Sequence, residues 1–194
     1  MADHRRATAE RNTEAILDAA EALLARGAAA STSAVASEAG VSRVTVYAHF
    51  PTREALLEAV VERVVHHATA AIDAAAIEDG EPLAALERLV AAGWEEIDRN
   101  RAVAHAASEQ LSAEAMARSH QALHAPITAL VARGQAEGAF RDDLPPGWLV
   151  ASYFALMHAC GDEVRAGRLP AERAVPVLQA TLRGMFSSGS SRSR

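Results

Sequence analysis

Apolar residues recur every three or four positions along most of this chain, the spacing that gathers them on one face of an α-helix. Pro126 is expected to kink or split the helix that contains it, because proline lacks the N–H that an internal helical position donates. The sequence therefore predicts an all-α protein. The predicted helices cover residues 9–26, 31–39, 42–50, 53–75, 82–100, 102–111, 112–137, 148–166 and 171–186.

The segment from Ser31 to Phe50 predicts two short helices joined by a tight turn. Ser31 and Ser42 are each placed to cap a helix with the side-chain hydroxyl. Gly40 suits the left-handed position that ends the first helix. Val46 and Phe50 are four residues apart, so both point inward. This arrangement is typical of a helix-turn-helix motif, whose second helix enters the major groove of DNA.

The outer face of the second helix supplies the candidate DNA contacts. Arg43 can reach a guanine edge or a phosphate, and Thr45 can reach a base or a methyl group. Tyr47 and His49 are interpreted as phosphate contacts, which position a protein on DNA without reading its sequence. For each residue, a solvated or partly packed role is the alternative. The predicted DNA-binding residues are Ser31, Ser42, Arg43, Val44, Thr45, Tyr47, His49 and Arg53.

Residues 40–60, GVSRVTVYAHFPTREALLEAV, resemble the signature of the TetR family of transcriptional regulators, and residues 15–27, AILDAAEALLARG, resemble its first helix. The specific resemblance covers about residues 11–65. Two residues depart from the family pattern. Val44 stands where Gly or Ala is common, although its branched side chain can touch a thymine methyl. Arg53 stands where Lys is usual.

The resemblance implies an all-helical homodimer with an N-terminal three-helix DNA-binding domain and a C-terminal domain for ligand binding and dimerisation. The expected boundaries are 1–52 for the DNA-binding domain and 53–187 for the second domain. Residues 188–194 form a low-complexity tail that is expected to be disordered. The implied partners are a double-stranded DNA operator, a small-molecule effector and a second copy of the chain.

Apolar stripes on the last two predicted helices favour pairing with a second copy, in an isologous four-helix interface. We expect a single chain to leave these stripes incompletely buried. The first stripe is Leu149, Tyr153, Leu156 and Cys160, and the second is Val175, Leu178, Leu182 and Met185.

Bulky apolar and titratable side chains are mixed on the C-terminal helices, which predicts a mostly apolar effector pocket with a few polar anchors. A simple core with surface histidines is the alternative. The predicted lining residues are Trp94, His105, Glu109, Met116, His120, Phe154, Met157 and His158.

His120 and His124 share one helix face and form half of a metal site, for which His105, Glu109 or His158 would be the third ligand. A helical metal-dependent enzyme is thus the alternative from another class. Because no full ligand motif is present, we expect no metal, no cofactor and no catalytic residue. The prediction is a transcriptional regulator, a repressor released by its effector. An activator and a ligand-independent regulator stay open.

Charge and composition refine this prediction. The 194 residues carry a net charge of −6, and residues 1–53 hold six Arg against six acidic residues. DNA affinity depends on local phosphate contacts, so the DNA-facing surface can still be positive if the acids of the first helix face away from DNA. The single Cys160 fits a reducing compartment. The polar first residues and the lack of an apolar run of about 20 residues predict a cytoplasmic protein without membrane contact.

Overall fold

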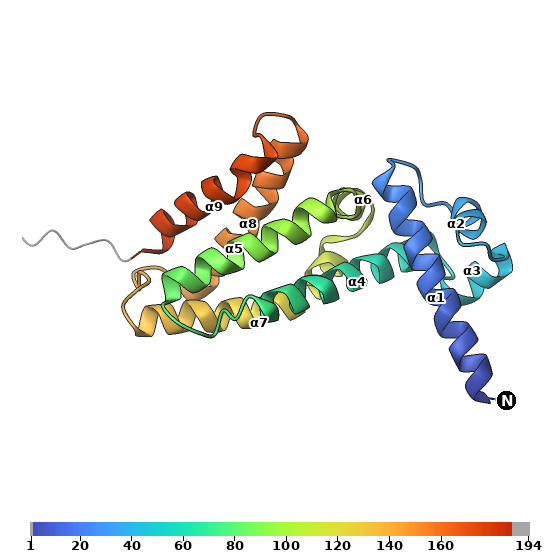
Figure 1. Cartoon of the computed structure of the whole chain (residues 1–194), viewed down its shortest axis with the longest axis horizontal. Coiled ribbons are helices and arrows are strands. Elements are labelled where there is room, and N and C mark those ends of the chain that lie inside the picture. The colour runs from blue at the N-terminus through green and yellow to red at the C-terminus, as the bar shows by residue number, and fades with distance from the viewer. Residues whose placement is uncertain (1, 188–194) are drawn as a thin grey trace, which may run out of the picture. The chain divides into compact units, whose positions relative to one another are not determined.

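A computed structural model describes residues 2–187, apart from the side chains of residues 2–5, 108, 113 and 116–121. This span is all-helical, as predicted, and the described residues form no strand, only an isolated bridge between Phe140 and Ser187. Each predicted helix corresponds to one observed helix (Figure 1). The helices are α1 (Ala2–Ala25), α2 (Thr32–Glu38), α3 (Arg43–His49), α4 (Arg53–Ala74), α5 (Pro82–Arg99), α6 (Arg101–Gln110), α7 (Ala113–Ala136), α8 (Pro146–Arg165) and α9 (Ala171–Phe186).

The chain forms two compact units. Unit 1 comprises Met1–Val64 and Asn100–Ser119, and unit 2 comprises Val65–Arg99 and His120–Arg194. The boundary between the units falls inside α4 and α7. The division into DNA-binding and effector-binding domains at residue 52 concerns function and stays a prediction. The predicted disordered tail, 188–194, lies outside the described residues.

Unit 1 is built around α1, which packs against α2, α3 and α6 (Figure 1). The spacing of Ile16 and Ala20 on α1 turns both side chains into the core, where they are almost fully buried. Val35 of α2 and Val46 of α3 are buried as well, at 0% and 1% exposure. Each of the two short helices therefore contributes an apolar side chain to the core of this unit.

In unit 2, α5 packs against both α8 and α9 (Figure 1). The absence of a side chain on Gly93 makes room for Tyr153, whose hydroxyl oxygen would lie 2.6 Å from an added Cβ. Two arginines hold the turn between α4 and α5. Arg88 donates hydrogen bonds to the carbonyls of Ala75, Ala76 and Asp79, and Arg133 of α7 donates to those of Ile77 and Gly80.

We expected a single chain to leave the apolar stripes of the last two helices incompletely buried. This expectation was wrong for most of the stripe residues. Within the single chain, α5 covers the inner faces of α8 and α9. Leu156, Val175 and Met185 are half-buried. The outward faces instead expose Trp148 at 61% and Val177 at 38%. The buried stripe residues are Leu149, Tyr153, Cys160, Leu178 and Leu182.

One helix prediction also needs correction, and of the two alternatives for Pro126, a kink or a split, only the kink stays open. The first helix begins at Ala2, well before residue 9, and an ion pair between Arg6 and Glu10, one turn apart, supports its first turns. Pro126 does not split its helix, since α7 is continuous from Ala113 to Ala136. Burial of Ile127 and Leu130 beside the proline gives this helix tertiary support at that point.

The close approach of Phe140 to α7 generates a stability prediction. A Cβ on Gly134 would lie 2.1 Å from Cδ2 of Phe140, whose ring is buried edge-on against Phe186. Gly134→Ala should therefore lower the free energy of unfolding by about 2 kcal/mol through overpacking. Urea unfolding at one fixed protein concentration measures this change.

The matched control is Gly147→Ala in α8, because no heavy atom lies within 4 Å of a Cβ added there. This substitution should leave the stability unchanged or raise it by up to about 1 kcal/mol, as alanine favours the helix. Equal stability of the two variants would contradict the packing described around Phe140.

Candidate nucleic-acid interface

The start of α3 is held by a side-chain cap. Ser42 Oγ accepts a hydrogen bond from the backbone N–H of Thr45 at 3.0 Å and lies 2.8 Å from the Thr45 hydroxyl. Ser31 caps α2 in the same way, accepting from the N–H of Ala34 at 3.2 Å. Both predicted caps are confirmed. The Thr45 hydroxyl takes part in the cap.

The turn between α2 and α3 has the geometry expected from its glycine. Gly40 has φ of +67°, a left-handed conformation that a residue with a Cβ adopts only with strain. The N–H of Val41 donates to the carbonyl of Ala36 at 3.0 Å and closes the end of α2. This turn sets the direction in which α3 leaves α2.

The face of α3 opposite its buried residue is open. Val46 is buried, whereas Val44 is 78% exposed and Tyr47 is 54% exposed. Arg43 is also exposed, and its side chain has no hydrogen-bond or ion-pair partner among the described residues. The structure therefore brings Arg43, Val44 and Tyr47 together on one accessible helix face.

His49, at the end of α3, is attached to α1. Its Nδ1 lies 3.1 Å from the hydroxyl oxygen of Thr13, in a half-buried contact. Sequence reasoning missed Thr13 as a functional candidate. The available signal was its spacing, because Thr13 is the polar member of a stripe that continues with Ile16, Leu17 and Ala20 at intervals of three and four.

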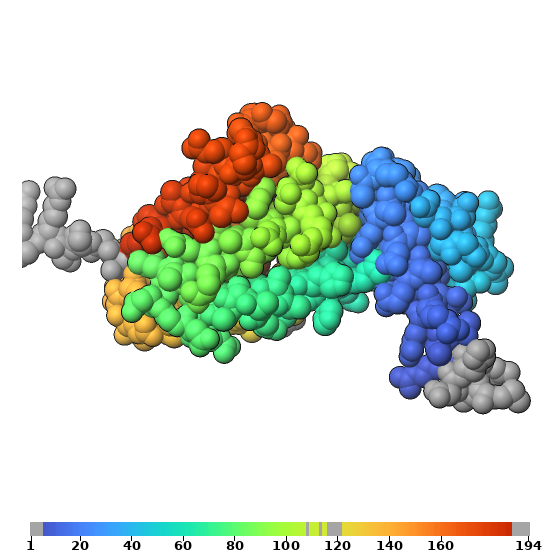
Figure 2. All heavy atoms as spheres, viewed as in Figure 1, coloured from blue at the N-terminus to red at the C-terminus, as the bar shows by residue number. Residues whose placement is uncertain are grey.

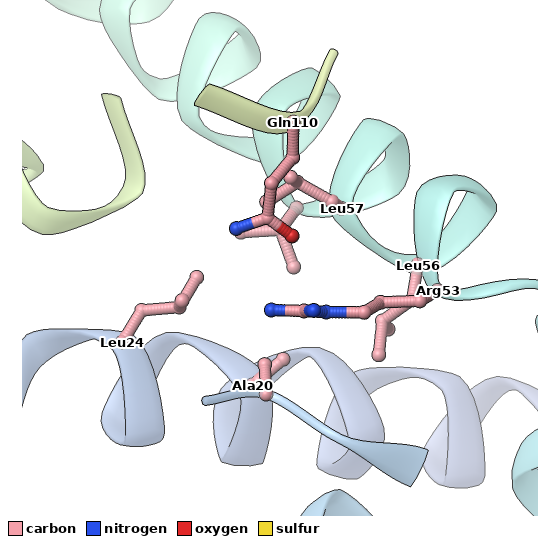
Figure 3. Close-up of a pocket in the computed structure, with 8 residues that line it drawn as sticks. Ala20, Leu24, Arg53, Leu56, Leu57 and Gln110 are labelled. Carbon is pink, nitrogen blue, oxygen red and sulfur yellow. The ribbon is translucent and has the colours of Figure 1, made fainter. Parts of the chain in front are cut away.

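Arg53 begins α4 beside a small pocket of unit 1 that has room for about one water molecule. Figure 3 shows its guanidinium and the Gln110 amide projecting into the space between the apolar side chains. Thr52 caps α4, accepting from the N–H of Ala55 at 3.0 Å. The phosphate contact of Arg53 stays a prediction, as its side chain here points into the pocket. The pocket is lined by Ala20, Leu24, Ala30, Arg53, Leu56, Leu57, Val60 and Gln110.

Three acidic residues of α1 pair with one arginine of α4. The guanidinium nitrogens of Arg63 lie 3.2 Å from a carboxylate oxygen of Glu14, 2.8 Å from one of Asp18 and 2.9 Å from one of Glu21. Burial alone would lower the pKa of Arg63, but the hydrogen bonds and charges of Glu21 and Asp18 outweigh burial and raise that pKa. These three carboxylates form one stripe of α1 that is turned toward α4. Their charge is therefore partly compensated within unit 1.

The predicted effector residues are distributed over both units. Trp94 and Met157 are buried in unit 2, and Phe154 stacks on His124 with ring centroids 4.6 Å apart. His158 is exposed on α8. The side chains of Met116 and His120 lie outside the described part of the chain. His105 and Glu109 belong to unit 1, where both are exposed. Nε2 of His105 lies 3.6 Å from Oε1 of Glu109. The pocket stays a prediction.

The described residues bear on both the metal and the membrane alternatives. Among these residues, no group of three or more His, Cys, Asp or Glu side chains could hold a metal ion. In the same part of the chain, no helix is both long and apolar enough to cross a membrane.

Comparisons with known proteins agree with this geometry. A family model described as bacterial regulatory proteins, tetR family, matches residues 16–60. The chain is 32% identical over 175 residues to the HTH-type transcriptional repressor LfrR of Mycolicibacterium smegmatis, covering 89% of each chain. The crystal structure of LfrR from Mycobacterium smegmatis in complex with proflavine has a TM-score of 0.68 and 30% identity, covering 91% of this chain and 96% of that one. FadR from Bacillus subtilis, solved in complex with stearoyl-CoA, shares the fold with a TM-score of 0.75 at 14% identity, covering 89% of this chain and 98% of FadR.

Proposed function

Because the chain belongs to the TetR family of bacterial regulatory proteins and is a DNA-binding transcriptional regulator, we propose that it represses transcription and that a small-molecule effector releases it from its operator. The observation that carries the DNA-binding role is the open face of α3, where Arg43, Val44 and Tyr47 are exposed while Val46 holds the helix. The repressor role is supported by LfrR, which is named a transcriptional repressor.

In the proposed complex, α3 lies in the major groove of the operator. Arg43 donates to a guanine edge, and Val44 touches the methyl group of a thymine, the one apolar group that this groove offers. Tyr47 and His49 contact phosphates, as do the N-terminal ends of α2 at Ser31 and of α3 at Ser42. These backbone contacts place the helix, and the base contacts select the sequence.

DNA binding has a direct test. Selection from a random duplex library at low salt should enrich one inverted repeat. On that operator, Arg43→Ala should raise Kd about tenfold or more and relax the preference at one base pair, because a good bidentate contact discriminates by about 1–3 kcal/mol. Tyr47→Ala should weaken binding on all sequences alike. Fluorescence anisotropy measures each Kd.

The matched control is Arg165→Ala, which removes an exposed arginine of α8 and should leave Kd unchanged. A selection that enriches no motif, with wild-type and Arg43→Ala proteins binding equally, would refute sequence-specific recognition by α3.

We further propose a homodimer through the outward faces of α8 and α9. The atoms of α9 lie at the surface of unit 2 (Figure 2). Trp148 of α8 and Val177 of α9 are exposed. Small residues at helical spacing from them are exposed as well, namely Ala151 and Ala155 on α8 and Ala180 on α9. Small residues let helices of two copies approach closely, and a two-fold axis makes the same face serve both copies.

A charge on this face should break the dimer. Val177→Arg would bury a charge without a partner, at a cost of several kcal/mol. Sedimentation at micromolar concentration should then show a species near the 20.4 kDa of one chain, against twice that mass for the wild type. Ala132→Arg, at an exposed position of α7, should stay dimeric. A wild-type monomer, or a dimeric Val177→Arg variant, would contradict this interface.

The effector is proposed to bind in unit 2 beside Trp94, Phe154 and Met157. LfrR has been solved with proflavine, a planar aromatic compound, which supports an aromatic-lined site. α4 belongs to both units and is proposed as the element that transmits effector binding to unit 1. In one conformation of the dimer, the two α3 helices would have a spacing that does not fit the operator. The effector releases DNA only if it binds this conformation more tightly than the DNA-binding conformation.

Proflavine provides the test. In a Trp148→Phe variant, Trp94 is the remaining tryptophan, since the chain has two. Adding proflavine should quench its emission and lower the anisotropy of a labelled operator over the same concentration range. Phe154→Ala should require more proflavine for both changes. Unchanged Trp94 emission together with unchanged operator binding would contradict a proflavine-like effector and favour a ligand-independent regulator.

A further inference from the structure

The hydroxyl of Thr13 makes two contacts at once. Thr13 Oγ1 lies 3.1 Å from the carbonyl oxygen of Ala9, one turn earlier on α1, and 3.1 Å from Nδ1 of His49 at the end of α3. The second contact joins residues that are 36 positions apart in the chain. It is thus a tertiary link between the long helix of unit 1 and the helix proposed to enter DNA.

The number of protons on these groups decides the direction of both bonds. A hydroxyl carries one proton, and a carbonyl oxygen can only accept. If both contacts are hydrogen bonds, the Thr13 hydroxyl must therefore donate to the carbonyl of Ala9 and accept from Nδ1 of His49. Nδ1 of His49 then carries a hydrogen. If Thr13 instead donated to His49, two oxygen lone pairs would face each other at 3.1 Å.

This direction has a consequence for the other ring nitrogen. A neutral imidazole has one N–H, so a ring with its hydrogen on Nδ1 has a bare lone pair on Nε2. That lone pair repels a phosphate oxygen. Once the ring takes up a second proton, Nε2 becomes a donor while the Nδ1 bond to Thr13 is kept. The contact to phosphate is then charge-assisted, and such hydrogen bonds are roughly twice as strong as neutral ones.

We infer that His49 contacts the operator backbone as an imidazolium, and that Thr13 is the positioning residue that ties DNA binding to the uptake of one proton. This inference rests on the proposed function, because it takes α3 to lie against DNA. It specifies the protonation state in which the site binds.

Other charged groups lie on the elements around this link. On α1, the charged residues within one turn of Thr13 are Glu10, Arg11 and Glu14. Glu10 pairs with Arg6, Arg11 donates to the Thr8 hydroxyl, and Glu14 pairs with Arg63. The first turn of α4 adds Arg53 and Glu54, and the ring of Phe50 lies beside His49 with centroids 6.3 Å apart. Among the described residues, Thr13 is the hydrogen-bond partner of the ring.

The sign of the pH dependence follows from linkage. If the complex needs the charged ring, binding takes up one proton, and Kd falls as the pH falls. An imidazole titrates near pH 6.5 in general. Above that value, full linkage of one proton makes Kd rise by up to about tenfold per pH unit.

The experiment measures Kd for the selected operator from pH 5.5 to 8.5 at constant ionic strength. Wild-type protein should bind about tenfold more weakly at pH 8 than at pH 6. Thr13→Val keeps the shape of the side chain but removes the acceptor, so the neutral ring can place its hydrogen on Nε2. Its Kd should depend much less on pH, and Thr13→Ser should restore the dependence.

His49→Gln provides the control for the other histidines, since the chain has eight. Gln donates a neutral hydrogen bond at every pH, so this variant should show only the background slope. A Thr13→Val variant with the wild-type slope, whose Kd is shifted equally at every pH, would overturn the inference and leave Thr13 a purely structural role.

A second measurement needs no DNA. Nitrogen-15 spectra of the histidine rings in the free protein distinguish the two neutral tautomers, and the signals lost in His49→Gln identify His49. We expect the neutral ring to carry its hydrogen on Nδ1, and a hydrogen on Nε2 would overturn the inference. If the tautomer is as expected but no duplex is bound specifically, the proposed function fails and the phosphate contact fails with it.

Discussion

A helix of seven residues, such as α3, has too few internal hydrogen bonds to persist alone in water. Everything that α3 can do therefore depends on how unit 1 holds it. Three kinds of restraint act on it: the Ser42 cap at its start, the burial of Val46 at its middle and the Thr13 bond to His49 at its end. Together they restrict both the tilt and the rotation of the helix, so that one face is held and the opposite face is open.

The acidic charge of the chain is compatible with DNA binding because charge is distributed unevenly within unit 1. Arg63 collects the carboxylates of Glu14, Asp18 and Glu21 on the side of α1 that faces α4. Arg43, by contrast, is open on α3. A phosphate responds to the charges within about a Debye length, which is roughly 8–10 Å at physiological salt. The local balance at α3 is thus the relevant quantity, and the net charge of the chain is not.

Sequence reasoning succeeded where a structural rule is local. The caps at Ser31 and Ser42, the left-handed Gly40 and the inward Val46 each depend on residues within one or two turns, and all are observed. It failed where the neighbour is distant in the chain. Periodicity showed that α8 and α9 have apolar stripes but not that α5 covers them. The Thr13 bond to His49 and the Arg63 cluster join residues at least 36 positions apart, so no local sequence pattern predicts these contacts. The rotation of the effector helices is unspecified for the same reason.

The central claim is that the open face of α3 contacts bases from the major groove. Dimethyl sulfate footprinting tests it directly, because the reagent methylates guanine N7 in the major groove and adenine N3 in the minor groove. Bound protein should protect N7 of guanines in two clusters, with half-site centres one helical turn or a multiple of it apart. Guanine N7 atoms that stay reactive throughout the bound site, with protection confined to adenine N3, would contradict it.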